Sequence, residues 1–257
     1  MLRACALIAA AGLSVVLAHA TPPKPRQQKS SITCKPGDSA HRCKAACASG
    51  AQESCAVLGI MHLRGEAGGK PDLSTARRLL KAACRARVAL GCGGLGSLYM
   101  LRKLPRKARP MFEKGCKMGD ALACESLGGM TVGAGMGPGG RDTAPTGASD
   151  LNARTRRAAP YYRRACQLGS GTGCAFVAAF IADGIVRGTA REALDLYVKA
   201  CGRGVGMACR HAVDLLKKPK AKKLAATLDV PRLSADLLKR GCKFGDAKSC
   251  ARTKATR

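Results

Sequence analysis

Six pairs of cysteines recur along this chain, and the two members of every pair stand eight positions apart. Successive pairs begin at intervals of 32 to 50 residues, which brackets the period of helical-hairpin repeats. A repeat protein is predicted, in which each unit packs mainly against its neighbours. The pairs are Cys47 with Cys55, Cys84 with Cys92, Cys116 with Cys124, Cys166 with Cys174, Cys201 with Cys209, and Cys242 with Cys250.

The residues before each pair predict a helix, which we call helix B of the unit. In the last five units a large residue stands four positions before the first cysteine and a small one eight positions before it. This four-residue step draws an apolar stripe along a helix. The large residues are Leu80, Phe112, Tyr162, Tyr197 and Leu238, and the small ones are Ala76, Ala108, Ala158, Ala193 and Ser234.

A turn and a second helix, helix A, are predicted around the second cysteine of each pair. Glycine stands three positions after the first cysteine in five of six units, where a left-handed helix cap favours it, and Arg87 is the exception. Asp120 and Asp246 follow two of these glycines and are predicted to cap the next helix. Small residues within helix A indicate close contacts, at Leu58-Gly59, Leu95-Gly96, Leu127-Gly128 and Val177-Ala178.

Two stretches interrupt the repeat. Residues 131–150 are rich in Gly, Pro, Ala and Thr, and we expect an inserted mobile loop there. Residues 217–223 are rich in lysine, and because Pro219 breaks a continuing helix we expect a solvated linker.

The first twenty residues have the features of a secretory signal peptide. Arg3 precedes an apolar run, and Ala18-His19-Ala20 provides a small-residue cleavage site before Thr21. A transmembrane helix is the alternative, but the apolar run is short for a bilayer. We therefore expect export to the periplasm or beyond, with an arm at 21–39, repeats at 40–252, a basic tail at 253–257 and no transmembrane segment after cleavage.

Cleavage would also remove Cys5 and leave fourteen cysteines, and an even number in an exported chain predicts a disulfide framework. Each pair would join helix B to the next helix A, and Cys34 with Cys43 would fasten the arm. Zinc binding by Cys34, His41, Cys43 and Cys47 is the alternative, although zinc ligands usually stand closer together in sequence.

The whole pattern resembles the Sel1-like repeat family, which is tetratricopeptide-like, and its cysteine pairing is similar to the secreted cysteine-rich branch of the Helicobacter type. The resemblance implies an all-α superhelix of helical hairpins, of which we expect five to six, with disulfides between helices. It spans about 40–252 and is carried by Leu58-Gly59, Leu95-Gly96-Ser97-Leu98-Tyr99, Ala158 to Tyr162, Ala193 to Tyr197, and Cys116 through Gly119-Asp120 to Cys124.

For function the resemblance implies either a scaffold that binds proteins on a concave surface or a protein that binds penicillin-type compounds and hydrolyses them slowly. No serine has a lysine three positions later, as a serine β-lactamase would. His41, His62 and His211 stand far apart, and Glu53, Glu113, Glu125 and Glu192 could share a groove only through the fold. We expect no cofactor, no metal and no catalytic centre.

Charge points to the class of partner. Lysine and arginine number 45 against 16 aspartate and glutamate residues, which gives a formal net charge of +29. Such a chain attracts polyanions. Nucleic acid is disfavoured by export and by an aromatic content of only 3%. We therefore expect a protein or a polyanionic cell-envelope partner, a concave groove lined by helix A, and basic charge on the outer surface.

Overall fold

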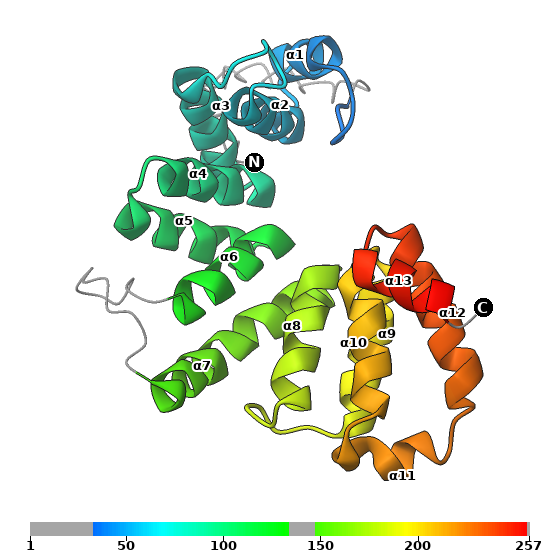
Figure 1. The fold of residues 1–257 in the computed structure, drawn as a ribbon. Coiled ribbons are helices and arrows are strands. Elements are labelled where there is room, and N and C mark those ends of the chain that lie inside the picture. The colour runs from blue at the N-terminus through cyan, green and yellow to red at the C-terminus, as the bar shows by residue number, and fades with distance from the viewer. Residues whose placement is uncertain (1–32, 134–146, 256–257) are drawn as a thin grey trace, which may run out of the picture.

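Every regular element in the computed structural model is a helix, within the described residues 33–133 and 147–255 (Figure 1). The predicted signal peptide at 1–20, the arm up to 32, most of the insertion and the end of the tail lie outside these residues. The helices are α1 (Ala40–Ala48), α2 (Gln52–Arg64), α3 (Leu73–Arg85), α4 (Ala89–Leu101), α5 (Pro105–Lys117), α6 (Ala121–Val132), α7 (Ala148–Gln167), α8 (Gly171–Ala182), α9 (Ala190–Gly202), α10 (Gly206–Leu216), η1 (Pro219–Ala221), α11 (Lys222–Ala225), α12 (Val230–Lys243) and α13 (Ala247–Ala255).

The long helices alternate between the two predicted kinds. Helix B of successive units is α1, α3, α5, α7, α9 and α12, and helix A is α2, α4, α6, α8, α10 and α13. Each packs against the helix before it and the helix after it, so the chain forms a solenoid. Figure 1 shows an arc with α3, α5 and α7 on its outer side and α6, α8 and α13 on its inner side. The all-α, helical-hairpin fold class is confirmed.

In the three hairpins α2–α3, α4–α5 and α6–α7, a glycine of helix A faces the large residue of the helix B that follows it. A Cβ atom added to Gly59 would stand 2.8 Å from Cγ of Leu80, and one added to Gly128 would stand 2.7 Å from Cε2 of Tyr162. Both large side chains are buried. The two helices of a hairpin can therefore approach closely because one of them lacks a side chain at the crossing.

The turns from helix B to helix A all share one hydrogen-bond pattern. The residue after the turn donates its backbone N–H to the carbonyl five residues earlier, as Asp120 does to Gly115 at 2.9 Å. This is the Schellman arrangement, which places the preceding residue in the left-handed region. Gly50, Gly119, Gly169, Gly204 and Gly245 hold that position with φ between 80° and 103°, and Arg87 holds it with φ 63°.

Side chains cap the start of several A helices, as the sequence predicts. Asp120 accepts from the backbone N–H of Leu122 at 3.0 Å, and Asp246 accepts from that of Ser249 at 3.0 Å. Ser170 caps α8 by accepting from Gly173 at 2.7 Å. These bonds satisfy N–H groups that have no partner inside the helix.

The fourteen cysteines of the described residues lie in seven pairs at bonding distance. Six pairs join the end of a helix B to the start of the next helix A, with Cα atoms 4.5 to 4.8 Å apart, and Cys34 with Cys43 holds the arm against α1 at 4.9 Å. All these separations suit a disulfide. The six are Cys47 with Cys55, Cys84 with Cys92, Cys116 with Cys124, Cys166 with Cys174, Cys201 with Cys209, and Cys242 with Cys250.

Both interrupting stretches contain more helix than their composition suggests. Helix α6 continues through Thr131 and Val132, and α7 includes 148–150, while 134–146 lie outside the described residues. Helix α10 ends at Leu216 and Pro219 starts η1, so the predicted break is present. The lysine-rich stretch is nevertheless ordered into η1 and α11 rather than being an irregular linker, because Ala221 is fully buried and anchors it.

Candidate functional site

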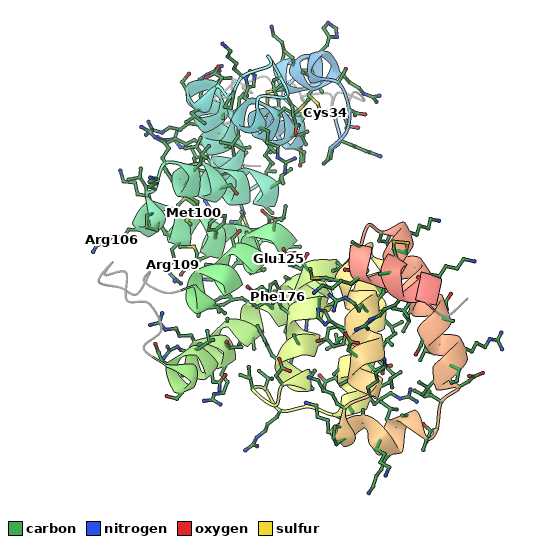
Figure 2. The ribbon with its side chains drawn as sticks, in the orientation of Figure 1. Cys34, Met100, Arg106, Arg109, Glu125 and Phe176 are labelled. Atoms are coloured by element: carbon green, nitrogen blue, oxygen red, sulfur yellow. A yellow bond between two sulfur atoms is a disulfide. The ribbon has the colours of Figure 1, made fainter. Side chains whose placement is uncertain are left out.

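Basic charge is divided unequally between the two kinds of helix. Helices α4, α6 and α8 contain no lysine or arginine, whereas α3, α5 and α7 contain many. Figure 2 shows these long side chains extending from the solenoid into solvent. The inner face is therefore almost uncharged over its middle, and the outer face is basic. The exposed cations of the outer helices include Arg77, Arg78, Lys81, Arg85, Arg106, Lys107, Lys114, Lys117, Arg156, Arg157, Arg163 and Arg164.

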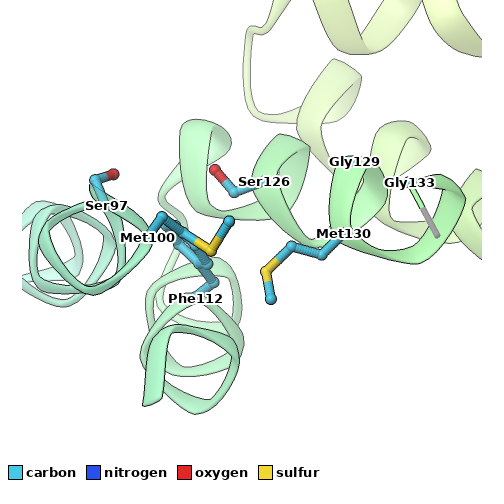
Figure 3. Close-up of a pocket in the computed structure, with 7 residues that line it drawn as sticks. All are labelled: Ser97, Met100, Phe112, Ser126, Gly129, Met130 and Gly133. Carbon is cyan, nitrogen blue, oxygen red and sulfur yellow. The ribbon is translucent and has the colours of Figure 1, made fainter. Parts of the chain in front are cut away.

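A cavity of about 480 Å³ lies where α4, α5 and α6 meet (Figure 3). Met100 of α4, Phe112 of α5 and Met130 of α6 converge on it from three helices, with Phe112 beside Met100. Ser97 and Ser126 add hydroxyl groups. The remaining lining comes from Gly129 and Gly133. The volume falls in the range of protein sites that bind small ligands.

The cavity has a closed floor and an open mouth. Phe112 and Met130 are 2% and 6% exposed, whereas Ser97 and Gly129 are exposed to solvent. The Ser97 hydroxyl donates to the carbonyl of Gly93 at 3.2 Å. Such a cavity buries apolar atoms and offers few hydrogen bonds, so it suits an apolar group.

The neighbouring crevice, between α6, α7 and α8, is filled by aromatic rings. Tyr162 lies with its ring centroid 4.5 Å from that of Phe176 and 5.7 Å from that of Phe180. Burial raises the pKa of the Tyr162 hydroxyl, and the carboxylate of Glu125 adds to that effect. Glu125 also accepts a hydrogen bond from the hydroxyl of Ser170. Its carboxylate therefore serves an interhelical contact.

An ion-pair network connects α10 to α13 near the C-terminal end. Arg210 Nε lies 3.2 Å from Oδ2 of Asp246, and Arg210 Nη1 lies 3.5 Å from Oδ2 of Asp214. Arg252 Nη1 lies 2.6 Å from Oδ1 of Asp214. Burial raises the pKa of Asp246, but hydrogen bonds from Ser249 and the charge of Arg210 outweigh it and hold that pKa below the usual value. The network thus packs the terminal helix against the solenoid.

His211 of α10 stacks on Tyr197 of α9, with ring centroids 5.8 Å apart. Burial lowers the pKa of His211, and the nearby Arg210 lowers it further, although Asp214, Asp246 and Asp183 oppose the shift. Burial, together with Asp183 and Asp214, raises the pKa of Tyr197 to about 12. Both rings are therefore neutral near pH 7 and act as packing groups.

The cysteines singled out from the sequence lie at the helix junctions and not at the cavity. The second cysteine of each pair is the fourth residue of its helix A, and all except the last are buried. None of the fourteen lines the cavity. Their place is structural, between neighbouring helices. These second cysteines are Cys55 of α2, Cys92 of α4, Cys124 of α6, Cys174 of α8, Cys209 of α10 and Cys250 of α13.

The histidines singled out from the sequence do not come together. His41, His62 and His211 belong to α1, α2 and α10. Within the described ranges no three residues among His, Cys, Asp and Glu form a cluster that could hold a metal ion. The cysteines of the zinc alternative, Cys34, Cys43 and Cys47, each lie at bonding distance from another cysteine.

The four glutamates occupy four separate helices. Glu53 lies in the first turn of α2 and Glu113 in α5, while Glu125 contacts Ser170. Glu192 of α9 pairs with Arg163 at 3.7 Å. This arrangement brings no two of these carboxylates together for acid–base chemistry.

The cavity and the ion-pair network were missed by sequence reasoning. The signal for the cavity was present, because Ser126 and Met130 stand where the next A helix has Phe176 and Phe180, counted from the paired cysteines.

No helix of the described part of the chain is both long and apolar enough to cross a membrane.

Comparison with solved structures identifies the fold. A Sel1 repeat protein from Oxalobacter formigenes is 18% identical, with a TM-score of 0.58, and the match covers 77% of this chain and 75% of that one. The immunity protein Pa5087 from Pseudomonas aeruginosa is 16% identical, with a TM-score of 0.51 and coverage of 88% and 84%. No protein-family model matches the sequence, and no curated protein does. The chain has the fold of Sel1 repeat proteins.

Proposed function

We propose that this chain is an exported scaffold of the Sel1 repeat type that binds a protein or an anionic component of the cell envelope. In this proposal residues 1–20 are a cleaved signal peptide, 21–39 form an arm, 40–252 carry the repeats and 253–257 form a basic tail. The fourteen cysteines from Cys34 to Cys250 form seven disulfides that stabilise the thin solenoid after export. The membership in the cysteine-rich branch of the Helicobacter type is part of the same proposal.

The division of charge between the two faces carries the proposal. Exposed cations crowd the outer helices, and α4, α6 and α8 on the inner side have none. A surface with one sign of charge concentrates partners of the opposite sign and accelerates their encounter. The curved stack of repeats adds an extended inner surface, which repeat proteins use for binding.

Binding to a polyanion tests the electrostatic part. The probe is fluorescently labelled poly-glutamate, and fluorescence anisotropy of the oxidised mature chain is measured between low salt and 1 M salt. We expect affinity to fall steeply with salt, because the Debye length shrinks from roughly 8 Å at physiological ionic strength to about 3 Å at 1 M. Salt-independent affinity or an absence of binding would contradict the proposal.

A charge-matched pair of variants locates the contact. Replacing Arg77, Arg78 and Lys81 of α3 with glutamine removes three cations from the outer face. The control replaces Lys217, Lys222 and Lys223 with glutamine, which removes the same charge from the segment around η1 and α11. We expect the first variant to lose more affinity for poly-glutamate than the second. An equal loss would show that net charge alone drives binding.

Export is tested separately. The protein is expressed in a Gram-negative host and purified from the periplasmic fraction, and its N-terminus is sequenced. We expect the mature chain to begin at Thr21 and to contain no free thiol. A chain that keeps residues 1–20 or has reactive thiols would contradict the export part.

The alternative, β-lactam binding or slow hydrolysis, rests on the family resemblance, and no contact among the described residues favours it. Turnover of a chromogenic β-lactam by the oxidised chain would support the β-lactam alternative. The control is the same chain after reduction and alkylation, since activity that belongs to the disulfide-bonded fold should be lost there.

A further inference from the structure

The cavity between α4, α5 and α6 exists because two side chains that fill the next crevice are small or flexible here. Counted from the second cysteine of each pair, Ser126 corresponds to Phe176 and Met130 to Phe180. Phe176 and Phe180 pack around Tyr162, with the three ring centroids 4.5 to 6.1 Å apart. In the earlier crevice, the corresponding space above Phe112 is the open volume of about 480 Å³. In the next unit, the corresponding space holds aromatic side chains. The space above Phe112 is therefore suited to an aromatic side chain.

The walls suit a large apolar side chain that enters from the inner face. Phe112 forms a buried aromatic floor next to Met100, and Met130 lines the space from α6 (Figure 3). Methionine side chains are flexible and polarizable, so they adapt to guests of different shape. The hydroxyl of Ser126 lies at the cavity without a hydrogen-bonded partner among the described residues, and it can bond to a peptide group at the mouth.

The charges that follow Met100 in the chain indicate which residues of a ligand should flank the apolar side chain in the cavity. Met100 lies in the last turn of α4, and the segment that follows it carries exposed cations at Arg102, Lys103, Arg106 and Lys107. No acidic residue interrupts this segment. Figure 2 shows Arg106 and Arg109 at the same end of the helices as Met100. A ligand that reaches from the cavity to this end meets clustered positive charge, which favours carboxylates.

We propose that this cavity is an anchor site for a peptide segment of a protein partner, which inserts one large apolar side chain between Met100 and Met130 and places neighbouring acidic residues against Arg102 and Lys103. This inference rests on the proposed binding function and specifies its partner: an acidic peptide with an aromatic or long aliphatic anchor. It differs from general polyanion binding because the apolar side chain is required.

The test uses the oxidised mature chain and two labelled synthetic peptides. One has a single phenylalanine flanked by glutamates, and the other has serine in its place. Anisotropy should show at least tenfold tighter binding of the phenylalanine peptide, because a buried aromatic side chain typically supplies more than the roughly 1.4 kcal/mol that a factor of ten requires. Equal binding of both peptides would overturn the proposal.

Filling the cavity is the second arm. Ser126→Phe introduces the residue of the next unit into the open space. We expect it to lower the affinity for the phenylalanine peptide at least tenfold. The matched control is Thr172→Phe, which adds the same ring at an exposed position of α8 outside the cavity. Circular dichroism and a thermal melt verify that both variants are folded. A folded Ser126→Phe protein that binds the peptide like the unsubstituted chain would overturn the proposal.

Two further measurements separate the possible explanations. Ser126→Phe should leave poly-glutamate binding unchanged. If the unsubstituted chain binds poly-glutamate in a salt-dependent way but shows no preference for the phenylalanine peptide, the anchor site is refuted and the proposed function is not. Salt-independent poly-glutamate binding would instead remove the proposed function. If N-acetyl-phenylalanine amide, which has no carboxylate, binds as tightly as the acidic peptide, the cavity is a small-molecule site and the peptide proposal is wrong.

Discussion

Gly96 of α4 lies so close to Phe112 of α5 that a Cβ atom on residue 96 would stand 2.6 Å from Cδ1 of the ring. Carbon atoms in van der Waals contact are about 3.5 to 4.0 Å apart. The ring is 2% exposed and forms the floor of the cavity, so it has little room to move away. The glycine therefore sets the separation of the two helices and the position of the cavity floor.

Gly96→Ala should destabilise the protein. Overpacking a well-filled site costs about 1–3 kcal/mol, and the better helix propensity of alanine returns up to about 1 kcal/mol of that. We expect a net loss of about 1–2 kcal/mol in the free energy of unfolding, measured by chemical denaturation. The control is Gly68→Ala, because a Cβ at Gly68 would meet nothing within 4 Å. A variant at 96 that is as stable as the control would contradict this account of the packing.

The repeat could be predicted because its constraints are local. Large residues such as Leu80 and Phe112 recur at one register before a cysteine, and glycines such as Gly59 and Gly96 recur at one register after its partner. The structure places the members of each such pair against one another. Turn and cap residues are equally local, so Gly119-Asp120 could be read directly as a helix-to-helix turn.

The cavity and the ion-pair network depend on neighbours that are distant in sequence. Arg210 and Asp246 meet at 3.2 Å although 36 residues separate them, and nothing in either segment alone predicts the contact. The cavity arises because Ser126 leaves volume empty beside Phe112. This difference becomes visible only when the unit is superposed on the next one. The prediction of a solvated linker at 217–223 was incomplete for the same reason, because the burial of Ala221 depends on contacts of η1 with α9 rather than on the lysines around it.

Removing one interhelical disulfide should weaken the solenoid measurably. For the double variant Cys84→Ala and Cys92→Ala, chain-entropy arguments predict a loss of roughly 2.5 kcal/mol, because the bond closes a loop of eight residues. Denaturant unfolding without reductant measures it. Peptide mapping under non-reducing conditions must show the other six pairs intact in the variant and all seven in the unsubstituted chain. Different partners in the map would refute the proposed pairing.

His211 should make stability depend on pH below its ordinary pKa. Burial and Arg210 lower its pKa in the folded state from the usual 6.5, so the unfolded chain binds the proton more readily. The stabilisation is complete above about pH 6.5 and is lost as the pH falls through that value toward the lower folded pKa. Melting temperatures at pH 7.5 and pH 5.5 measure the effect.

The matched variant for this pH dependence is His211→Gln, which keeps a polar side chain on α10 but cannot titrate. We expect its melting temperature to change less between the two pH values than that of the unsubstituted chain. Asp246 has a lowered pKa and contributes to acid destabilisation at lower pH, in both proteins alike. If both proteins lose the same stability between pH 7.5 and 5.5, His211 is not the group responsible.

Arg87→Gly should stabilise the protein, because residue 87 is the only one of the six turn positions in the described chain that lacks glycine while adopting a positive φ. A left-handed conformation costs a side-chain-bearing residue about 1–2 kcal/mol, and the greater entropy of unfolded glycine offsets roughly 0.5–1 kcal/mol of the gain. We expect a net gain of about 0.5–1 kcal/mol by chemical denaturation. The reverse change, Gly169→Ala, is open sterically but has φ 103°, so it should lose about 1 kcal/mol or more. A destabilised Arg87→Gly variant would mean that the arginine side chain makes a contact worth more than the backbone strain it imposes.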